Sequence, residues 1–242
     1  MNLNRILLVV GLLLAAPTWA HEVEEEAGPE GPWSGKVSLG YLGTSGNTDT
    51  TNMSGAFEVE YAVEKWTHQF KAAAIKASES NVTTAEAYNA GWKTERQLSE
   101  ASFLFGRLDW RKDRFSGYDE QFSQTIGYGH RLIDNDKHTL NGELGFGARQ
   151  SELADGTTEN ETILTGGLYY KWQISDTAEF TQDLLVEAGD ENTYTMSKTA
   201  LSATLINDLA LVASYTIKNN SDVPLGTEKT DTFTAISLEY PF

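Results

Sequence analysis

Apolar and polar residues alternate along most of the chain after residue 32, in stretches separated by turn-forming residues. In the last stretch, one face carries at every second position Thr232, Thr234, Ile236, Leu238, Tyr240 and Phe242. A period of two residues is typical of β-strands that have one face in an apolar environment. The chain therefore reads as a series of β-strands.

This criterion predicts about twelve strands, over residues 33–44, 51–63, 66–76, 85–98, 102–112, 121–132, 138–150, 162–174, 178–188, 194–206 and 209–218, with a last strand that ends the chain. The alternation is weak around residues 72–74. Long predicted connections, rich in Gly, Ser, Asn, Asp and Thr, alternate with short ones such as "EK" at 64–65 and "ND" at 207–208. An even number of strands with short turns at one end and longer loops at the other is typical of bacterial outer-membrane barrels.

We therefore predict an all-β fold, an antiparallel transmembrane up-and-down β-barrel, over residues 33–242. Closure removes the unpaired N–H and C=O groups that an open sheet would expose to lipid. Aromatic residues near the strand ends, such as Trp33, Trp66 and Trp92, suit the lipid–water boundary. The alternative is a soluble sandwich or barrel with these rings in its core, but the second face of nearly every strand is polar.

The first 32 residues predict export. Arg5, the apolar run 6–16 and the small residues around Ala20 are typical of a secretory signal peptide over residues 1–20. A membrane anchor is the alternative, but the run is shorter than the ~20 residues that a spanning helix needs. Residues 21–32, "HEVEEEAGPEGP", predict an acidic periplasmic leader. We expect a Gram-negative outer-membrane protein with both mature termini in the periplasm.

Composition narrows the function classes. The 242 residues carry a net charge of -17, which argues against a nucleic-acid partner. The chain has no Cys and only four His without ligand spacing, so we predict no disulfide, no metal site and no cofactor.

The polar faces of the strands predict a charged lumen. We expect its lining to include Lys71, Lys93, Arg107, Asp109, Arg111, Arg131, Glu143, Arg149, Lys171, Asp183 and Glu187. Paired charges could close the interior as an ion-pair plug. Alternatively, a narrow water-filled channel could run between a basic wall on the fifth to eighth strands and an acidic wall on the ninth and twelfth. The sequence leaves both interpretations open.

The chain ends on an aromatic residue in the apolar register. Such an ending resembles the C-terminal signal read by the outer-membrane barrel assembly machinery, here Ile236, Leu238, Tyr240 and Phe242. The resemblance implies this machinery as a partner during insertion. Outer-membrane lipid would surround the finished barrel, which we expect to be a monomer.

Three segments carry a family resemblance: "GYLGTSGNTDTTN" at 40–52, "WRKDRFSGYDEQFSQTIGYGHRL" at 110–132 and "LNGELGFGAR" at 140–149. With them the chain resembles the YdiY-like family of salt-induced outer-membrane proteins, a domain of unknown function. The resemblance implies an outer-membrane barrel but supplies no reaction or ligand. Its motif positions are Thr44, Ser45, Gly46, Asn47, Thr48, Asp113, Arg114, Phe115, Ser116, Gly117 and Tyr118.

Both motifs fall at extracellular turns in the predicted topology. Gly46-Asn47 and Ser116-Gly117 supply turn conformations at low cost. Asp113 and Arg114 could pair with each other or with neighbouring loops and fold a lid over the pore; turn chemistry alone is the other interpretation.

The resulting functional hypothesis is a narrow, weakly selective channel for ions or small polar solutes, linked by the resemblance to salt or osmotic stress. A closed barrel that acts through its structure or its loops is the alternative. An outer-membrane lipid hydrolase is a further alternative, because His68 and His130 lie on apolar registers. No serine is obviously paired with His130, so we do not expect an enzyme.

Overall fold

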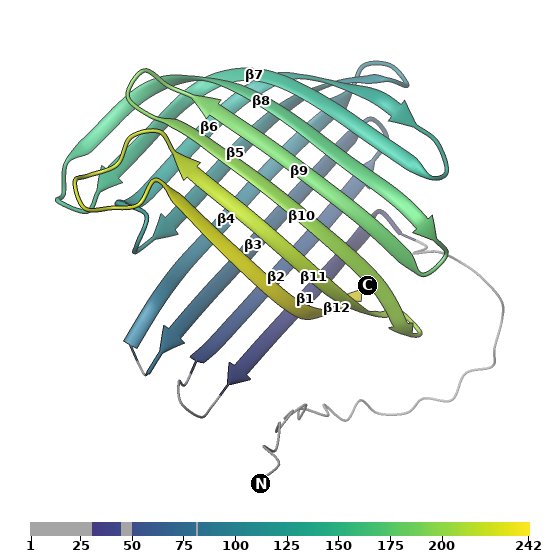
Figure 1. Ribbon diagram of the computed structural model, residues 1–242. Coiled ribbons are helices and arrows are strands. Elements are labelled where there is room, and N and C mark those ends of the chain that lie inside the picture. The colour runs from purple at the N-terminus through teal and green to yellow at the C-terminus, as the bar shows by residue number, and fades with distance from the viewer. Residues whose placement is uncertain (1–30, 45–49, 81) are drawn as a thin grey trace, which may run out of the picture.

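A computed structural model describes residues 31–44, 50–80 and 82–242. In this part of the chain twelve antiparallel strands form a closed barrel in which β1 lies beside β12 (Figure 1). The strands are β1 (Trp33–Thr44), β2 (Thr50–Val63), β3 (Trp66–Glu79), β4 (Val82–Gln97), β5 (Ser102–Asp113), β6 (Tyr118–Asp134), β7 (His138–Leu153), β8 (Thr158–Ser175), β9 (Ala178–Ala188), β10 (Thr193–Ile206), β11 (Leu209–Asn220) and β12 (Thr230–Pro241). The predicted all-β antiparallel barrel is confirmed.

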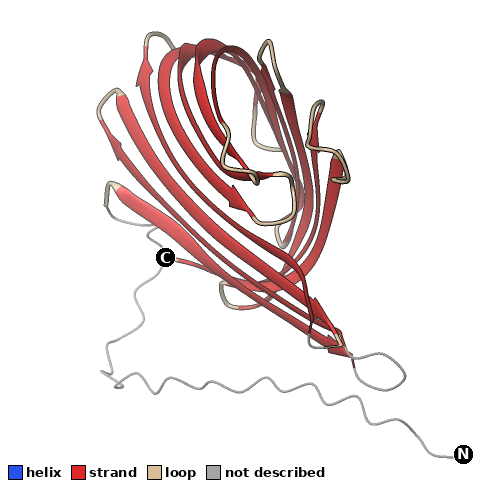
Figure 2. Cartoon of the chain, turned by 90° about the vertical axis from the view of Figure 1, so that its left-hand side faces the viewer, coloured by secondary structure: helices blue, strands red, loops and turns tan. Residues whose placement is uncertain are grey.

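The rest of the secondary structure consists of turns and loops at the two rims (Figure 2). No helix among residues 31–44, 50–80 and 82–242 is long and apolar enough to cross a membrane. The predicted signal peptide, most of the predicted leader, and Ser45, Gly46, Asn47 and Thr48 lie outside the described residues.

We call the rim that holds the start of β1 and the end of β12 the terminal end, and the opposite rim the loop end. The prediction of mostly long connections at the loop end was wrong. The connections 114–117, 154–157 and 189–192 are short, and among the described residues only 221–229 forms an extended loop at this end. The strands absorb the remaining residues because the alternation continues beyond the predicted limits; β8, for example, is 18 residues long.

The two faces of the barrel wall have opposite character. Large apolar side chains on the outer face are exposed, as at Leu144 (73%) and Leu164 (68%). Many polar and charged side chains on the inner face are buried; Arg149 and Ser123 are 0% exposed. An apolar outer band around a polar interior is the arrangement of a barrel whose solvent is lipid.

Phe242 helps to close the barrel through a contact with Gly35 that we call the clasp. Gly35 and Phe242 exchange both backbone hydrogen bonds, at 2.8 and 2.9 Å, next to the ladder that joins β1 and β12. The Phe242 ring stacks on Phe57 with 6.2 Å between ring centroids. A Cβ atom on Gly35 would lie 2.5 Å from the Phe242 ring, so this ring position requires a glycine beneath it.

Candidate functional site: the charged interior of the barrel

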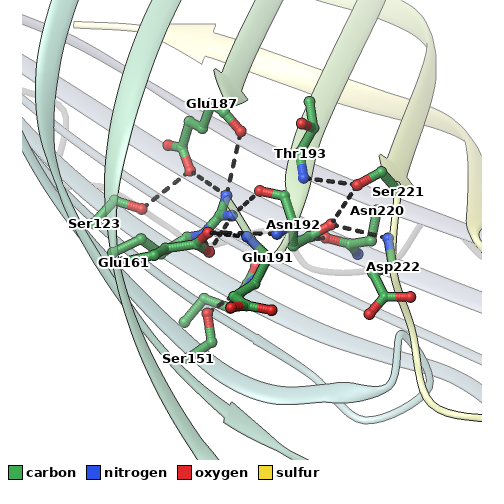
Figure 3. A network of polar contacts seen from close by, with 12 residues as sticks. Ser123, Ser151, Glu161, Glu187, Glu191, Asn192, Thr193, Asn220, Ser221 and Asp222 are labelled. Atoms are coloured by element: carbon green, nitrogen blue, oxygen red, sulfur yellow. Dashed lines mark hydrogen bonds and ion pairs between the residues drawn. The ribbon is translucent and has the colours of Figure 1, made fainter. Parts of the chain in front are cut away.

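Arg149 on β7 is the centre of a buried network near the loop end, and Figure 3 labels its partners Glu161, Glu187 and Asn192. Its Nε and Nη2 donate to Glu161 Oε1 on β8, at 3.0 and 2.5 Å. Its Nη1 lies 3.4 Å from Glu187 Oε2 on β9, and Nη2 also donates to the carbonyl oxygen of Asn192. This guanidinium is therefore neutralised by two carboxylates in the interior of the barrel.

Glu187 extends the network across the lumen. Its Oε2 accepts hydrogen bonds from Arg111 Nη2 on β5 at 2.6 Å and from the Ser123 hydroxyl on β6 at 3.1 Å. The Arg111 guanidinium also lies 4.0 Å from the ring centroid of Tyr194 on β10. Because β5 is not a neighbour of β9 or β10 in the wall, these contacts bridge the interior.

The turn at 189–192 packs against these inner side chains. Glu161 Oε2 accepts the backbone N–H groups of Glu191 at 3.1 Å and Asn192 at 3.4 Å. The Asn192 side chain donates to Asn220 Oδ1 on β11 at 2.8 Å. A Cβ atom on Gly189 would overlap the Glu161 carboxylate, so a glycine permits this approach. The turn therefore narrows the loop end from inside.

A second contact across the lumen lies beside the first. Lys218 Nζ on β11 is 3.6 Å from Asp113 Oδ2 at the end of β5. The loop 221–229 reaches the turn between β5 and β6, where Pro224 would lie 2.8 Å from a Cβ atom on Gly117. Gly117 has a φ of 84°, which glycine adopts without steric cost. We call the ion pairs Arg111–Glu187 and Lys218–Asp113 the cross-lumen bridges.

A third cluster fills the interior between β4 and β8. The carboxylate of Glu143 on β7 pairs with Lys93 on β4 and with Arg107 on β5. The Arg107 guanidinium lies 5.7 Å from the ring centroid of Tyr169 on β8. Lys93 also pairs with Glu95 at 2.7 Å. These side chains are mostly buried, so this side of the interior is packed rather than open.

Two aromatic rings complete that packing. Phe103 and Phe105 on β5 are 1% and 4% exposed. On β6, the Phe103 ring lies over Gly129 and the Phe105 ring over Gly127. A Cβ atom at either glycine would come into conflict with a ring. The glycines thus let the rings lie flat against the inner wall.

The solvent-accessible part of the interior, here called the accessible side, comprises the inner faces of β1 to β3 and the terminal end of β8. Lys36 pairs with Glu239 at 3.4 Å, Lys71 with Glu58 at 3.2 Å, and Lys171 with Glu179 at 2.6 Å. The lysine side chains are 43%, 51% and 55% exposed. Charged groups that remain this exposed inside a barrel indicate water on this side.

The eleven residues predicted to line the lumen fall into these environments. Six of them belong to the buried clusters: Lys93, Arg107, Glu143, Arg111, Arg149 and Glu187. On the accessible side lie Lys71 and Lys171, and Asp183 lies on β9 opposite Lys198 of β10. Asp109 Oδ2 has no hydrogen-bond partner among the described residues. Arg131 lies at the terminal end, where it donates to the Glu100 carbonyl oxygen at 2.7 Å.

One expectation about these charges was wrong, and of the two kinds of pairing expected for Asp113 and Arg114 the mutual one does not form. A basic wall does not face a separate acidic wall, because Glu143 lies on β7 and the carboxylate of Glu187 is bridged directly to Arg111. Asp113 and Arg114 do not pair with each other: Asp113 meets Lys218, and Arg114 meets Glu86 at 3.5 Å. Successive residues of a strand point to opposite faces, which separates Asp113 at the end of β5 from Arg114.

The remaining motif positions occupy the rim. Thr44 ends β1, Phe115 is exposed in the turn 114–117, and Tyr118 begins β6 with 3% exposure. The Ser116 hydroxyl donates to the carbonyl oxygens of Asp113 and Tyr118, at 3.3 and 3.2 Å.

The predicted lumen lining does not include Glu161 and Asn192, because both fall in or at the edge of predicted loops. The signal that could have found Glu161 is the alternation 159, 161, 163, 165, which carries the inner register of β8 past the predicted start. No local pattern marks Asn192, since its position depends on the folding-in of the turn.

Three histidines contact hydroxyl groups. His68 Nδ1 lies 2.9 Å from the Thr94 hydroxyl, His130 Nδ1 lies 3.2 Å from the Tyr128 hydroxyl, and His138 Nδ1 lies 2.8 Å from the Tyr170 hydroxyl. All three rings also stack on aromatic neighbours. They form part of an aromatic belt near the terminal end.

Comparisons with known proteins agree with this architecture. An uncharacterized protein, YdiY, from Escherichia coli (strain K12) is 29% identical over 219 residues, which cover 90% of this chain and 86% of that protein. The COG4313 outer membrane channel from Pseudomonas putida F1 has a TM-score of 0.51 at 12% identity, covering 91% of this chain and 100% of that one. The NanC porin has a TM-score of 0.48 at 10% identity, covering 86% and 97%.

The likeness to the COG4313 outer membrane channel supports the fold, a closed antiparallel β-barrel. The family model described as "Protein of unknown function, DUF481" matches residues 37–242, and the predicted kinship with YdiY is confirmed. The chain belongs to this family of proteins of unknown function, DUF481.

Proposed function

We propose that this protein is a narrow, weakly selective outer-membrane channel for ions or small polar solutes, closed in this structure at its loop end. The observation that carries the proposal is the charged interior, accessible on one side at Lys36, Lys71 and Lys171. Each of these lysines has a carboxylate partner. A lining in which both signs compensate favours polar solutes without strong preference for one charge.

The cross-lumen bridges are the proposed closing element. Arg111–Glu187 and Lys218–Asp113 join β5 to β9 and β11 through the interior, beneath the loop 221–229. Opening requires these side chains to separate, which exchanges each ion pair for contacts with water. Lys218 and Asp113 are the better candidates to separate first, because their charged atoms are 3.6 Å apart, whereas Glu187 is held by both Arg111 and Arg149.

The test is single-channel recording in planar bilayers. Lys218→Gln combined with Asp113→Asn removes one bridge without leaving a charge unpaired, and we expect a higher conductance or open probability than in the unchanged protein. The control is Lys112→Gln with Asp119→Asn, an ion pair of 3.2 Å whose side chains are 41% and 43% exposed. Absence of current in every variant, at all voltages, would favour the closed barrel that acts through structure or loops.

We extend the proposal to the cellular setting. The mature chain would be exported by its signal peptide, inserted by the barrel assembly machinery and left as a monomer with periplasmic termini. The outward register of Ile236 and Tyr240 and the clasp at Phe242 support a role for this ending in assembly. A cysteine at Asp155, in a loop-end turn, should react with a membrane-impermeant maleimide in intact cells; labelling only after envelope disruption would contradict this orientation.

The resemblance to a family of salt-induced proteins adds a link to salt or osmotic stress. A strain that lacks the protein should then grow more slowly after an abrupt rise in salt, and the bridge-free double variant should change that response. Equal growth of the deletion and parent strains at every salt concentration would remove this part of the proposal.

A further inference from the structure

The ladder that closes the barrel is short. It joins β1 and β12 from Lys36↔Pro241 to Gly40↔Ser237, next to the Gly35–Phe242 clasp, and then stops. Every other pair of neighbouring strands is in register over ten residues or more. Beyond this ladder, β1 and β12 diverge toward the loop end (Figure 1). We call the region between residues 41–44 of β1 and 233–236 of β12, which would face each other if the ladder continued, the lateral opening.

The two strand edges at the lateral opening face each other without a ladder between them in the part of the chain that the structure describes. Backbone N–H and C=O groups on such edges cost several kcal/mol each in hydrocarbon unless they find a partner. β1 is 12 residues long, close to the ~9–11 that a tilted strand needs to cross the membrane. The opening therefore lies at membrane depth and requires polar partners there.

Outside the opening the surface is apolar. Tyr41 on β1, Met53 on β2 and Ile236 on β12 are 64%, 54% and 51% exposed and carry no charge. Charged residues of the outer register begin at Lys76 on β3, opposite Met53, and include Lys112 on β5. Hydrocarbon thus extends up to the lateral opening.

Inside the opening the lining is uncharged. Leu42, in the same register as Lys36 and Ser38, is 51% exposed, and Phe233 and Ala235 occupy the inner register of β12. Charged groups begin beyond these residues, at the Lys36–Glu239 pair toward the terminal end and at Asp231, opposite Lys218, toward the loop end. A molecule at this position meets hydrocarbon on one side, unpaired backbone groups at the edges and the lumen on the other side.

We infer that the lateral opening binds a zwitterionic membrane phospholipid, with the headgroup inside the barrel and the acyl chains in the surrounding leaflet. The phosphate accepts hydrogen bonds from free N–H groups of the edges, and an ammonium group donates to free C=O groups. A zwitterion suits this site because its lining offers hydrogen bonds but no charge. The inference is independent of conduction through the lumen.

The opening itself is tested by disulfide formation, which the absence of native cysteines makes simple. Gly43 would face Thr234 if the ladder continued, and Leu39↔Leu238 is a matched pair inside the ladder with the same register. Under mild oxidant, Leu39→Cys with Leu238→Cys should cross-link readily, and Gly43→Cys with Thr234→Cys several-fold more slowly or not at all. Heat-modifiable migration in gels verifies that both variants are folded. Equal rates would show a continuous wall and overturn the inference.

The occupant is tested by photo-cross-linking in vesicles of phosphatidylethanolamine and phosphatidylglycerol. Benzophenone attached to Leu42→Cys should form phosphatidylethanolamine adducts, detected by mass spectrometry, several-fold more often than at Ser202→Cys on the inner face of β10. Leu144→Cys, on the lipid-facing surface, is the positive control. Equal and low lipid yields at Leu42 and Ser202 would mean that water fills the opening. Adducts only to phosphatidylglycerol or to a polypeptide in cells would replace the proposed occupant with an anionic lipid or an added strand.

Discussion

At the scale of single residues, the interior is organised around charges that are buried together with their partners. Arg149 is 0% exposed and contacts Glu161, Glu187 and the Asn192 carbonyl oxygen. A guanidinium provides five donors in a fixed plane, which suits contact with several acceptors at once. Removal of the cation leaves the Glu161 carboxylate without its ion-pair partner and Glu187 with Arg111 alone, and this asymmetry dominates the energetics.

Arg149→Met should therefore lower the free energy of unfolding by about 3–5 kcal/mol, the range for breaking a buried pair. The control is Arg114→Met, whose side chain is 67% exposed beside Glu86 and whose loss should cost less than about 1 kcal/mol. Urea unfolding in lipid vesicles, followed by tryptophan fluorescence, measures both variants. Equal effects would mean that the buried network contributes little to stability.

At the scale of the strand, glycines decide where rings can lie against the barrel wall. Gly35 on β1 accommodates the Phe242 ring at the closing ladder. Gly129 on β6 accommodates Phe103 on the inner face. In both places the glycine has no side chain, and an aromatic ring occupies the space that a side chain would fill.

Gly35→Val should slow assembly and weaken the closed barrel, because the new side chain would displace the Phe242 ring from the clasp. Gly55→Val on β2 is the matched control, since its Cβ atom would have no neighbour nearer than 3.7 Å. Time courses of heat-modifiable folding into vesicles compare the two. The clasp is unimportant if both variants fold at the parent rate.

Gly129→Ala should lower stability by about 1–3 kcal/mol through overpacking against the Phe103 ring. Gly166→Ala, whose Cβ atom would meet only Leu144 at 3.9 Å, should change stability far less. Phe103→Leu in the Gly129→Ala background should restore part of the loss in the same urea experiment. A rescue that fails would place the strain elsewhere.

At the scale of the whole molecule, the interior is divided lengthwise. One side is packed with the cluster around Glu143 and Phe105, and the other keeps Lys36 and Lys71 accessible beside their acidic partners. The cross-lumen bridges then close the loop end. Any conducting path must follow the accessible side, so its charges are expected to set the ion preference.

Lys71→Glu should shift the reversal potential in a salt gradient toward cation preference, because it places a second carboxylate beside Glu58 on that side. Lys76→Glu, on the outer face of β3 next to Met53, changes the net charge equally but should leave the reversal potential unmoved. The measurement is made in the bridge-free double variant if the parent conducts too rarely. Identical shifts in both variants would locate the effect outside the lumen.

Sequence by itself determined which face of each strand meets lipid, since a period of two assigns side chains to faces without knowledge of the partner strand. It also determined the number of strands and the family, and it brought Arg107, Arg111 and Glu187 to the inner surface. Tertiary structure decided that Arg111 meets Glu187 and that Asp113 meets Lys218, because such neighbours depend on the stagger and diameter of the closed barrel. It also decided where the β1–β12 ladder stops. Alternation assigns side chains to the two faces of a strand, but it does not determine how many residues of two neighbouring strands pair.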